Sequence, residues 1–254
     1  MTDWKDKTVL ITGATAGFGA ACARRYAKAG ARLVLAGRRV ERLESLRQEL
    51  GERTHILALD VRDAEGVAAA IATLPTEFNA IDLLINNAGL ALGLEPAQRA
   101  ELSDWDTMVD TNIKGLMYVT RAILPGMVER DRGHIVNLGS VASKYPYPGG
   151  NVYGGTKAFV HQFSLNLRSD LLGSKVRVSV IEPGMCETEF SVVRFKGDAE
   201  KASKVYEGVA ALSADDIAEC IFWTTTLPAH ININALEVMP VQQAFAPFAV
   251  SRES

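Results

Sequence analysis

Seven short apolar runs alternate with stretches of helical length along the whole chain. Most of the runs are continuous in Val, Ile and Leu, as strands buried on both faces of a sheet should be. The runs occupy residues 8–12, 32–36, 55–59, 82–85, 134–138, 177–181 and 235–239. The helix-length stretches occupy residues 17–29, 39–50, 63–74, 103–128 and 151–172. Since parallel strands need crossover connections of this kind, the pattern predicts one α/β domain over residues 1–254. We expect a doubly wound (Rossmann) fold whose seven-stranded, mostly parallel sheet is flanked by helices.

Composition and charge exclude several classes of protein. The chain has 254 residues, of which 48% are hydrophobic and 22% charged, so it has the apolar side chains for a core of its own. Its net charge of −3, without a basic block, predicts no nucleic-acid partner. No apolar run approaches the ~20 residues of a membrane span, and charges alternate at the N-terminus, so we expect neither a membrane segment nor a signal peptide.

The cysteines and histidines predict neither a disulfide framework nor a metal site. Cys22, Cys186 and Cys220 are far apart and odd in number, which is typical of a protein from the reducing cytoplasm. The four histidines are equally scattered and lack metal-ligand spacing. We therefore expect a cytoplasmic protein without a bound metal.

Two segments depart from the alternating pattern. Residues 184–211 follow the sixth run, are irregular and mix positive with negative charge. We expect them to form a mobile substrate lid, named the lid segment below. Residues 240–254 form a C-terminal tail whose first part is apolar and contains Phe245 and Phe248. Since a solvated tail would be more polar, we expect this tail to lie across a neighbouring subunit and to help close its substrate pocket.

A glycine-rich turn follows the first predicted strand. Residues 12–19 read TGATAGFG, and small residues continue as the next helix begins. Such a turn lets the backbone approach a pyrophosphate, which the N–H groups at the helix N-terminus then bind. The turn therefore predicts a dinucleotide site with contacts from Gly13, Thr15, Ala16, Gly17, Phe18 and Gly19.

The ends of the second and third predicted strands bear on the choice of cofactor. NAD sites usually place a carboxylate after the second strand, but here Arg38 and Arg39 stand at that place. Guanidinium groups suit the 2′-phosphate of NADP(H), whereas the plainer interpretation is two solvated side chains at the start of a helix. Asp60 and Val61 follow the third strand, and Asp60 either lies beside the adenine or belongs to the cap of the next helix.

Polar residues follow the fourth and fifth predicted strands, at the edge of the sheet where ligands bind. The motif NNAG (86–89) ends the fourth strand, and Ser140 follows the fifth. Thirteen residues after Ser140, Tyr153 and Lys157 have a YxxxK spacing that places both on one face of a helix. Asn112 lies within a long helical stretch. Together, and in this order, these motifs are far more specific than YxxxK alone.

With these motifs the chain resembles the short-chain dehydrogenase/reductase family over essentially its whole length. Within the family it is most similar to the NADP-dependent 3-hydroxy acid dehydrogenases, through residues 86–93, 149–160, 189–198 and 227–241. It also resembles the sulfoacetaldehyde reductases, a neighbouring branch, and residues 185–187 depart from the sequence expected of the hydroxy acid enzymes. The resemblance implies an NADP(H)-dependent enzyme assembled as a homotetramer. It implies further cofactor contacts from Asn87, Ala88, Gly89, Tyr153, Lys157, Pro183, Gly184 and Thr188.

The resemblance also implies four catalytic residues, Asn112, Ser140, Tyr153 and Lys157. A tyrosine has an unperturbed pKa of ~10, and the Lys157 ammonium would lower the pKa of Tyr153 toward the working range. Ser140 would orient the substrate oxygen, and Lys157 would also hold the nicotinamide ribose. Asn112 is expected, by resemblance, to hold a water in a proton relay behind Lys157.

We expect a small anionic substrate with a hydroxyl or carbonyl group at the β position. An anion in a closed site needs a fixed partner. Arg194, which lies between apolar residues of the lid segment, suits a carboxylate or a sulfonate, with Lys196 as a second charge. Asn151 would add a donor to a substrate site completed by Ser140 and Tyr153. The alternative is that Arg194 is exposed or pairs with a neighbouring subunit.

Three functions remain open at this point. The first is the interconversion of a 3-hydroxy acid and its carbonyl form. The second is the reduction of sulfoacetaldehyde to isethionate. Sulfoacetaldehyde differs from malonate semialdehyde, a carbonyl form of a 3-hydroxy acid, only in having a sulfonate in place of the carboxylate, so a similar pocket could bind either. The third is a non-catalytic, NADP-sensing binding protein. Such proteins usually lose the tyrosine or the lysine, and this chain has both.

Overall fold

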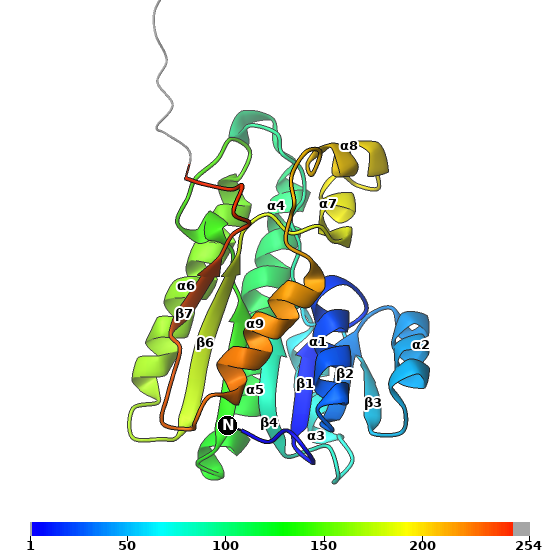
Figure 1. The fold of residues 1–254 in the computed structure, drawn as a ribbon, viewed down its shortest axis with the longest axis vertical. Coiled ribbons are helices and arrows are strands. Elements are labelled where there is room, and N and C mark those ends of the chain that lie inside the picture. Colours follow the sequence, from blue (N-terminus) through cyan, green and yellow to red (C-terminus); the bar gives the residue numbers. More distant parts are fainter. Residues whose placement is uncertain (1, 246–254) are drawn as a thin grey trace, which may run out of the picture.

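The computed structural model describes residues 2–245, and a parallel sheet forms its centre (Figure 1). The strand order is β3-β2-β1-β4-β5-β6-β7, and every pairing between these strands is parallel. The strands are β1 (Thr8–Thr12), β2 (Arg32–Gly37), β3 (Thr54–Ala58), β4 (Ile81–Asn86), β5 (Gly133–Leu138), β6 (Val176–Pro183) and β7 (Ala235–Val238). All seven predicted strands are confirmed, with bounds that differ by no more than two residues.

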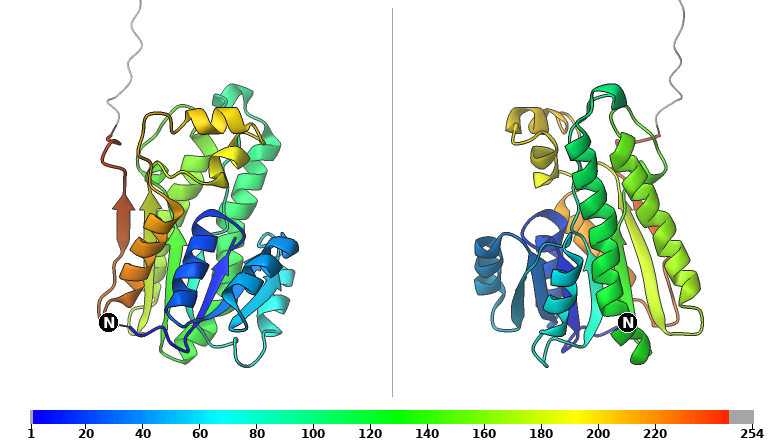
Figure 2. Two further views of the ribbon diagram at one scale, coloured as in Figure 1. Left: turned by 45° about the vertical axis from the view of Figure 1, so that its right-hand side comes forward. Right: turned by 180° about the vertical axis from the view of Figure 1, so that it is seen from behind.

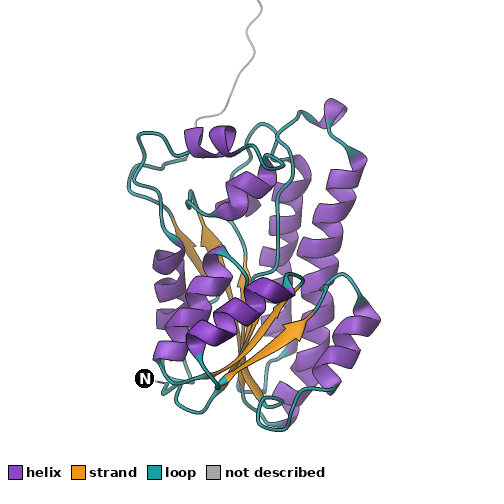
Figure 3. Ribbon diagram, turned by 90° about the vertical axis from the view of Figure 1, so that its right-hand side faces the viewer, coloured by secondary structure: helices purple, strands orange, loops and turns teal. Residues whose placement is uncertain are grey.

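Helices cover both faces of the sheet (Figure 3). One face carries α1 (Gly17–Lys28), α2 (Val40–Leu50) and α9 (Ala214–Thr226). The other carries α3 (Ala64–Ala72), α5 (Leu116–Glu129) and α6 (Asn151–Asp170), of which α5 and α6 lie side by side (Figure 2). Successive strand residues point to opposite faces, so Val9 and Ile11 enter the first core and Leu10 the second. The doubly wound arrangement predicted from the alternating pattern is therefore confirmed.

The long helical stretch predicted over residues 103–128 is not one continuous α-helix. It consists of α4 (Leu102–Val109), a π-helical turn (Asp110–Gly115) and α5. A Cβ at Gly115 would lie 2.6 Å from Val61 Cγ2, so this turn approaches the loop after β3 only because it has no side chain there. The π-helical turn contains Asn112, the candidate catalytic asparagine.

The lid segment contains two short helices, α7 (Glu189–Arg194) and α8 (Ala199–Lys204). They lie beyond the carboxyl ends of the strands, in the yellow part of the chain (Figure 1). Side chains cap both: Thr188 accepts from the backbone of α7 and Asp198 from that of α8. Within residues 2–245, no helix has the length and apolar character needed to cross a membrane.

The described part of the C-terminal tail contacts the lid segment of its own chain. Gln243 Oε1 accepts a hydrogen bond from the Met185 backbone N–H at 2.7 Å. Gln242 Oε1 accepts one from the Ala210 backbone N–H at 2.6 Å. The remainder of the tail, residues 246–254, lies outside the described residues, and so does its expected contact with a neighbouring subunit.

Candidate active site

The glycine turn between β1 and α1 lies at the carboxyl ends of the strands and is held by the segment after β4. Gly13 has a φ of +65°, and a Cβ there would lie 2.9 Å from Ala88 Cα, so this position requires glycine. Asn87 Nδ2 donates to the Thr12 carbonyl at 2.9 Å and to the Gly13 carbonyl at 3.0 Å. Asn87 and Ala88 therefore shape the turn as well as facing the cleft beside it.

Helix α1 begins without a capping side chain. Ala16 stands at its N-cap position, and no side chain there accepts from the first turn of the helix. The N-terminus of α1 faces the cleft between Thr15, Gly17 and Phe18. Since the first N–H groups of a helix have no intrahelical partners, this end can bind a phosphate group.

Arg38 and Arg39 line the far end of this cleft, where the sequence predicts a phosphate contact. Arg39 donates to Thr15 Oγ1 through Nε at 3.0 Å and Nη2 at 2.6 Å. Arg38 Nη1 lies 4.0 Å from Asp60 Oδ2. The guanidinium group of Arg39 is thereby tied to the glycine turn.

Asp60 faces the cleft and is not the cap of the next helix. The cap of α3 is Asp63, whose Oδ1 accepts from the Gly66 backbone N–H at 3.0 Å. Asp60 accepts two side-chain hydrogen bonds from Arg62 Nε and one from Nη2, and these lower the pKa of its carboxyl. Asp60 is therefore a paired carboxylate at the edge of the cleft.

A carboxylate of the lid segment lies against the arginine end of the cleft. Glu189 Oε2 lies 3.3 Å from Arg39 Nη1, and both Glu189 oxygens accept from Arg42 Nη1, at 2.9 and 3.0 Å. Next to Glu189, Thr188 lies over the glycine turn, where a Cβ at Gly17 would be 3.5 Å from Thr188 Cβ. The lid segment thus lies over the cleft from the glycine turn to the arginines.

Ser140, Tyr153 and Lys157 come together at the other end of the cleft, and each is at most 9% exposed. The Ser140 side chain lies near the Tyr153 hydroxyl, whose pKa it lowers, and it accepts from the Ala142 backbone N–H at 3.1 Å. Lys157 Nζ donates to the Leu138 carbonyl at 2.7 Å and lies 5.8 Å from the centre of the Tyr153 ring. Helix α6 therefore presents its tyrosine and lysine to the serine that follows β5, as the YxxxK spacing predicts.

Burial governs the protonation of Tyr153 and Lys157 in the protein alone. It raises the pKa of Tyr153 above the ordinary value, while Ser140 and the charge of Arg194 act in the opposite direction. Burial lowers the pKa of Lys157 to about 8. The amine is therefore mostly charged at neutral pH. That this charge lowers the pKa of Tyr153 stays a prediction.

Asn112 joins the segment after β4 to α6. Its Oδ1 accepts from the Leu90 backbone N–H at 2.9 Å, and its Nδ2 donates to the Leu90 carbonyl at 2.8 Å and to Thr156 Oγ1 at 3.0 Å. Both amide hydrogens are thus engaged by the protein. A role in a proton relay behind Lys157 stays a prediction, and the contacts of Asn112 indicate a structural link beside that lysine.

Arg194 of the lid segment lies beside Tyr153. Its guanidinium carbon is 5.6 Å from the centre of the Tyr153 ring and 5.3 Å from that of Tyr147. Arg194 Nη2 donates to the Tyr147 hydroxyl at 2.8 Å, and Nε donates to the Gly93 carbonyl at 3.3 Å. The residue predicted to bind a substrate anion therefore lies next to Tyr153, although it is not among the residues that line the cleft.

Two other expected substrate contacts are engaged by the protein itself. Lys196 Nζ pairs with Asp104 Oδ2 at 2.9 Å, and its role as a second charge for the substrate stays a prediction. Asn151 Nδ2 donates to the Glu95 carbonyl at 3.2 Å, and its Oδ1 accepts from the Val152 backbone N–H at 2.7 Å. Asn151 lines a separate hollow and is not brought into the cleft, because its side chain is engaged by its own turn and by a neighbouring loop.

Most of the predicted cofactor contacts line the one cleft. They are Gly13, Thr15, Ala16, Gly17, Phe18, Arg38, Arg39, Asp60, Val61, Asn87, Ala88, Gly89, Tyr153, Lys157 and Thr188. Gly19, Pro183 and Gly184 lie outside the lining, and a Cβ at Gly19 would be 2.6 Å from Asn87 Nδ2. The lining residues that the sequence did not single out are Gly37, Leu59, Leu90, Thr111, Leu138, Gly139, Glu189, Phe190 and Val193. Within residues 2–245 no group of three His, Cys, Asp or Glu side chains could hold a metal ion.

The sheet order, the glycine turn and the Ser–Tyr–Lys arrangement together define a dinucleotide-dependent oxidoreductase of one particular class. Residues 7–199 match the family described as short chain dehydrogenase, and the chain belongs to this family.

Several relatives match the chain over almost their whole length. The NADP-dependent 3-hydroxy acid dehydrogenase YdfG of Salmonella typhi is 60% identical, over 96% of this chain and 99% of the relative. The serine 3-dehydrogenase of Agrobacterium fabrum is 57% identical, over 97% of this chain and 99% of the relative. Among solved structures, a closed form of serine dehydrogenase complexed with NADP+ is 57% identical, with a TM-score of 0.96 over 97% of this chain and all of that one.

Proposed function

We propose that the protein is an NADP(H)-dependent dehydrogenase that interconverts a 3-hydroxy acid and its carbonyl form. The observation that carries this proposal is the position of Arg194 beside Tyr153, a residue that lines the cleft whose other end holds Arg38 and Arg39. A substrate anion and a 2′-phosphate each have a cationic partner in this arrangement. The relatives named for serine and 3-hydroxy acids support the same substrate class and give no support to the sulfoacetaldehyde alternative.

The residues of the cleft fit the proposed cofactor. The glycine turn and the N-terminus of α1 would hold the pyrophosphate, Arg38 and Arg39 the 2′-phosphate, and Lys157 the nicotinamide ribose. The fit rests on a turn that has no side chain at Gly13 and Gly17, where both glycines line the cleft. The carboxylates at the arginine end, Asp60 and Glu189, are already paired with arginines. When bound, the cofactor supplies or accepts the hydride.

The protein itself handles the proton and the orientation of the substrate. Tyr153 donates a proton to the carbonyl oxygen in reduction and accepts one from the hydroxyl group in oxidation. Ser140 holds the same oxygen, and Lys157 stabilises the phenolate form of Tyr153. Arg194 binds the carboxylate, which fixes the distance between the anion and the reacting carbon.

Steady-state kinetics test the function directly. Oxidation of serine, 3-hydroxypropionate and isethionate is measured with NADP+ and with NAD+, and we expect turnover of a hydroxy acid with NADP+. Turnover of isethionate alone would contradict the substrate class. Cofactor binding without turnover of any of these compounds or their aldehydes would indicate the NADP-sensing protein instead.

Replacement of Arg194 tests the proposed anion contact. For Arg194→Met, we expect kcat/KM to fall about tenfold or more with an anionic substrate, the scale of one charge-assisted hydrogen bond. A neutral aldehyde of similar size should lose much less, because it makes no contact with the guanidinium group and is affected only through the pKa of Tyr153.

Lys196→Met is the matched control for this prediction. Lys196 lies two residues further along the lid segment and pairs with Asp104, so its loss removes one positive charge without touching the catalytic end. Its ratio of kcat/KM for charged and neutral substrates should stay at the wild-type value. An equal loss on both substrates in Arg194→Met would place Arg194 in the scaffold.

We further infer a cytoplasmic homotetramer in which the lid segment covers the substrate. The cytoplasmic location is supported by three cysteines that are free in the structure. Assembly is supported by two exposed apolar side chains: Leu172, in the turn after α6, is 85% exposed, and Trp223, on α9, is 52% exposed. Sedimentation velocity measures the assembly, and a monomer at micromolar concentration would overturn it.

A further inference from the structure

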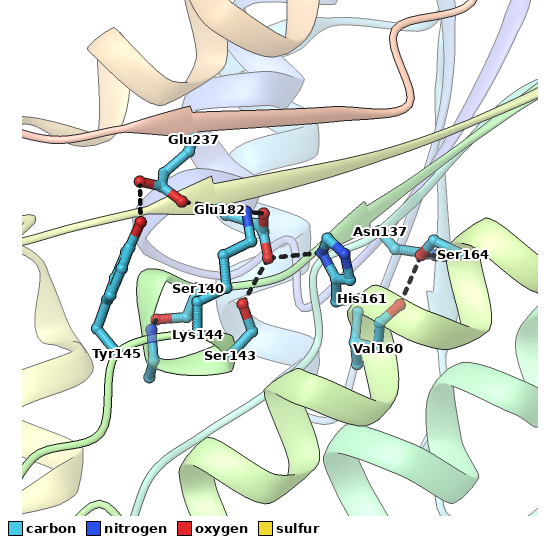
Figure 4. Close-up of polar contacts among 11 residues, drawn as sticks. Asn137, Ser140, Ser143, Lys144, Tyr145, Val160, His161, Ser164, Glu182 and Glu237 are labelled. Atoms are coloured by element: carbon cyan, nitrogen blue, oxygen red, sulfur yellow. Dashed lines mark hydrogen bonds and ion pairs between the residues drawn. The ribbon is translucent and has the colours of Figure 1, made fainter.

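Glu182 is a buried carboxylate that the proposed chemistry does not use. It lies on β6 with no exposed surface. Its Oε1 accepts from Ser143 Oγ at 2.6 Å and from His161 Nδ1 at 2.9 Å, and its Oε2 pairs with Lys144 Nζ at 2.7 Å (Figure 4). A buried carboxylate is strongly destabilising without such partners. Three donors therefore converge on one side chain just behind the catalytic end of the cleft.

These donors come from the two elements that carry the candidate catalytic residues. Two of them belong to the loop that begins at Ser140, and the third, His161, lies about one helical turn after Lys157 in α6. On the other side of Ser140, the chain packs on the aliphatic part of the Glu182 side chain: a Cβ at Gly139 would lie 2.9 Å from Glu182 Cγ. Glu182 thus contacts the loop both before and after Ser140 and links it to α6.

The direction of the Ser140 hydroxyl depends on the same loop. Ser140 Oγ accepts from the Ala142 backbone N–H at 3.1 Å, and the next residue, Ser143, is bound to Glu182. A displacement of residues 142–144 would therefore carry the Ser140 hydroxyl with it. Tyr153, by contrast, is fixed by α6, to which Glu182 is joined through His161.

We propose that Glu182 is a positioning residue that sets the distance between the Ser140 and Tyr153 hydroxyl groups. It lines no part of the cleft and acts by fastening the loop of residues 139–144 to α6. This role rests on the proposed function of Ser140 and Tyr153 in the dehydrogenase reaction. Proton transfer requires the hydroxyl groups of Tyr153 and Ser140 to reach the same substrate oxygen atom. A small displacement of either hydroxyl group therefore slows the reaction.

Glu182→Gln tests the proposal, because it keeps the shape of the side chain and removes its charge. We expect kcat to fall by about 10- to 100-fold, the scale of a misplaced catalytic group. The KM for the hydroxy acid and the Kd for NADPH should stay within about threefold of wild type, since no lining residue is changed. A crystal structure of the variant should show the Ser140 hydroxyl moved away from Tyr153.

Two further variants separate positioning from general stability. Glu237→Gln changes the outer end of the same network, where Glu237 accepts from Lys144 Nζ and from the Tyr145 hydroxyl, both at 3.1 Å. It should leave kcat near the wild-type value. Ser143→Ala removes one hydrogen bond from the loop side alone, and it should lower kcat without weakening NADPH binding even if Glu182→Gln fails to fold.

Two results would overturn the proposal. One is an unchanged kcat in both Glu182→Gln and Ser143→Ala, with Ser140 in its original place. The other is a parallel loss of kcat and of NADPH affinity, which indicates a general structural role. If the wild-type protein turns over no hydroxy acid, the proposed function fails, and the position of Ser140 in the variant structures still decides the role of Glu182.

Discussion

Tyr153→Phe should lower kcat by about 10²- to 10⁴-fold, the contribution of a positioned general acid or base. The phenol is 8% exposed and lies against Ser140, and phenylalanine removes the hydroxyl group that transfers the proton. Phenylalanine fills almost the same volume, so the packing against Phe190, whose ring centre is 5.7 Å away, should persist. The Kd for NADPH, measured by fluorescence titration, should therefore change by no more than about threefold.

Tyr118→Phe is the matched control for this result. Tyr118 lies on α5, packs against the core of that face and has no hydrogen bond to its hydroxyl within residues 2–245. The control should retain wild-type kcat. If Tyr153→Phe keeps a tenth or more of the wild-type activity, Tyr153 is not the group that transfers the proton.

Arg38→Ala combined with Arg39→Ala should raise the Kd for NADPH by about 100-fold or more, because two charge-assisted hydrogen bonds of ~1.5–3 kcal/mol each are lost. NADH has no 2′-phosphate, so its Kd should change only a few fold. Isothermal titration of both cofactors, and of 2′,5′-ADP against 5′-AMP, measures the difference. Because 2′,5′-ADP and 5′-AMP lack the nicotinamide half of the cofactor, their affinities report on the adenosine end of the site alone.

Arg42→Ala controls for the lid segment in this experiment. Like Arg39, Arg42 binds Glu189, but it does not line the cleft. Its loss releases part of the lid contact and should leave the preference for NADPH over NADH intact. Equal losses of affinity for both cofactors in the double variant would show that Arg38 and Arg39 hold the fold rather than the phosphate.

The sequence predicts the fold of this protein well because local patterns determine it. Most strands are buried apolar runs, and each crossover has the length and the spacing of a helix. The parallel order therefore follows from the rules of connection. The π-helical turn at residues 110–115 is the exception. It contains Gly115, which closely approaches Val61 across the structure, and no local pattern reports such a contact.

The candidate site is predictable where its residues follow strand ends or share one helix face. Tyr153, Lys157 and Ser140 meet these conditions, and the structure brings them together. Ion pairs between segments that are distant in the sequence cannot be predicted in this way. Lys196 looks like a free charge in the sequence, yet it pairs with Asp104 on α4. The three donors around Glu182 likewise lie 21 to 39 residues away along the chain.

The ion pairs of Glu189 with Arg39 and Arg42 affect how a phosphate group would bind at the arginine end of the cleft. These arginines already hold one anion, which belongs to α7. A 2′-phosphate that takes Arg39 must displace this carboxylate, so its binding is an ion exchange within a site that is partly neutralised beforehand. Dissolved salt weakens the contact that is lost as well as the one that is gained. The affinity for NADPH should therefore depend less steeply on ionic strength than the number of arginines alone would imply.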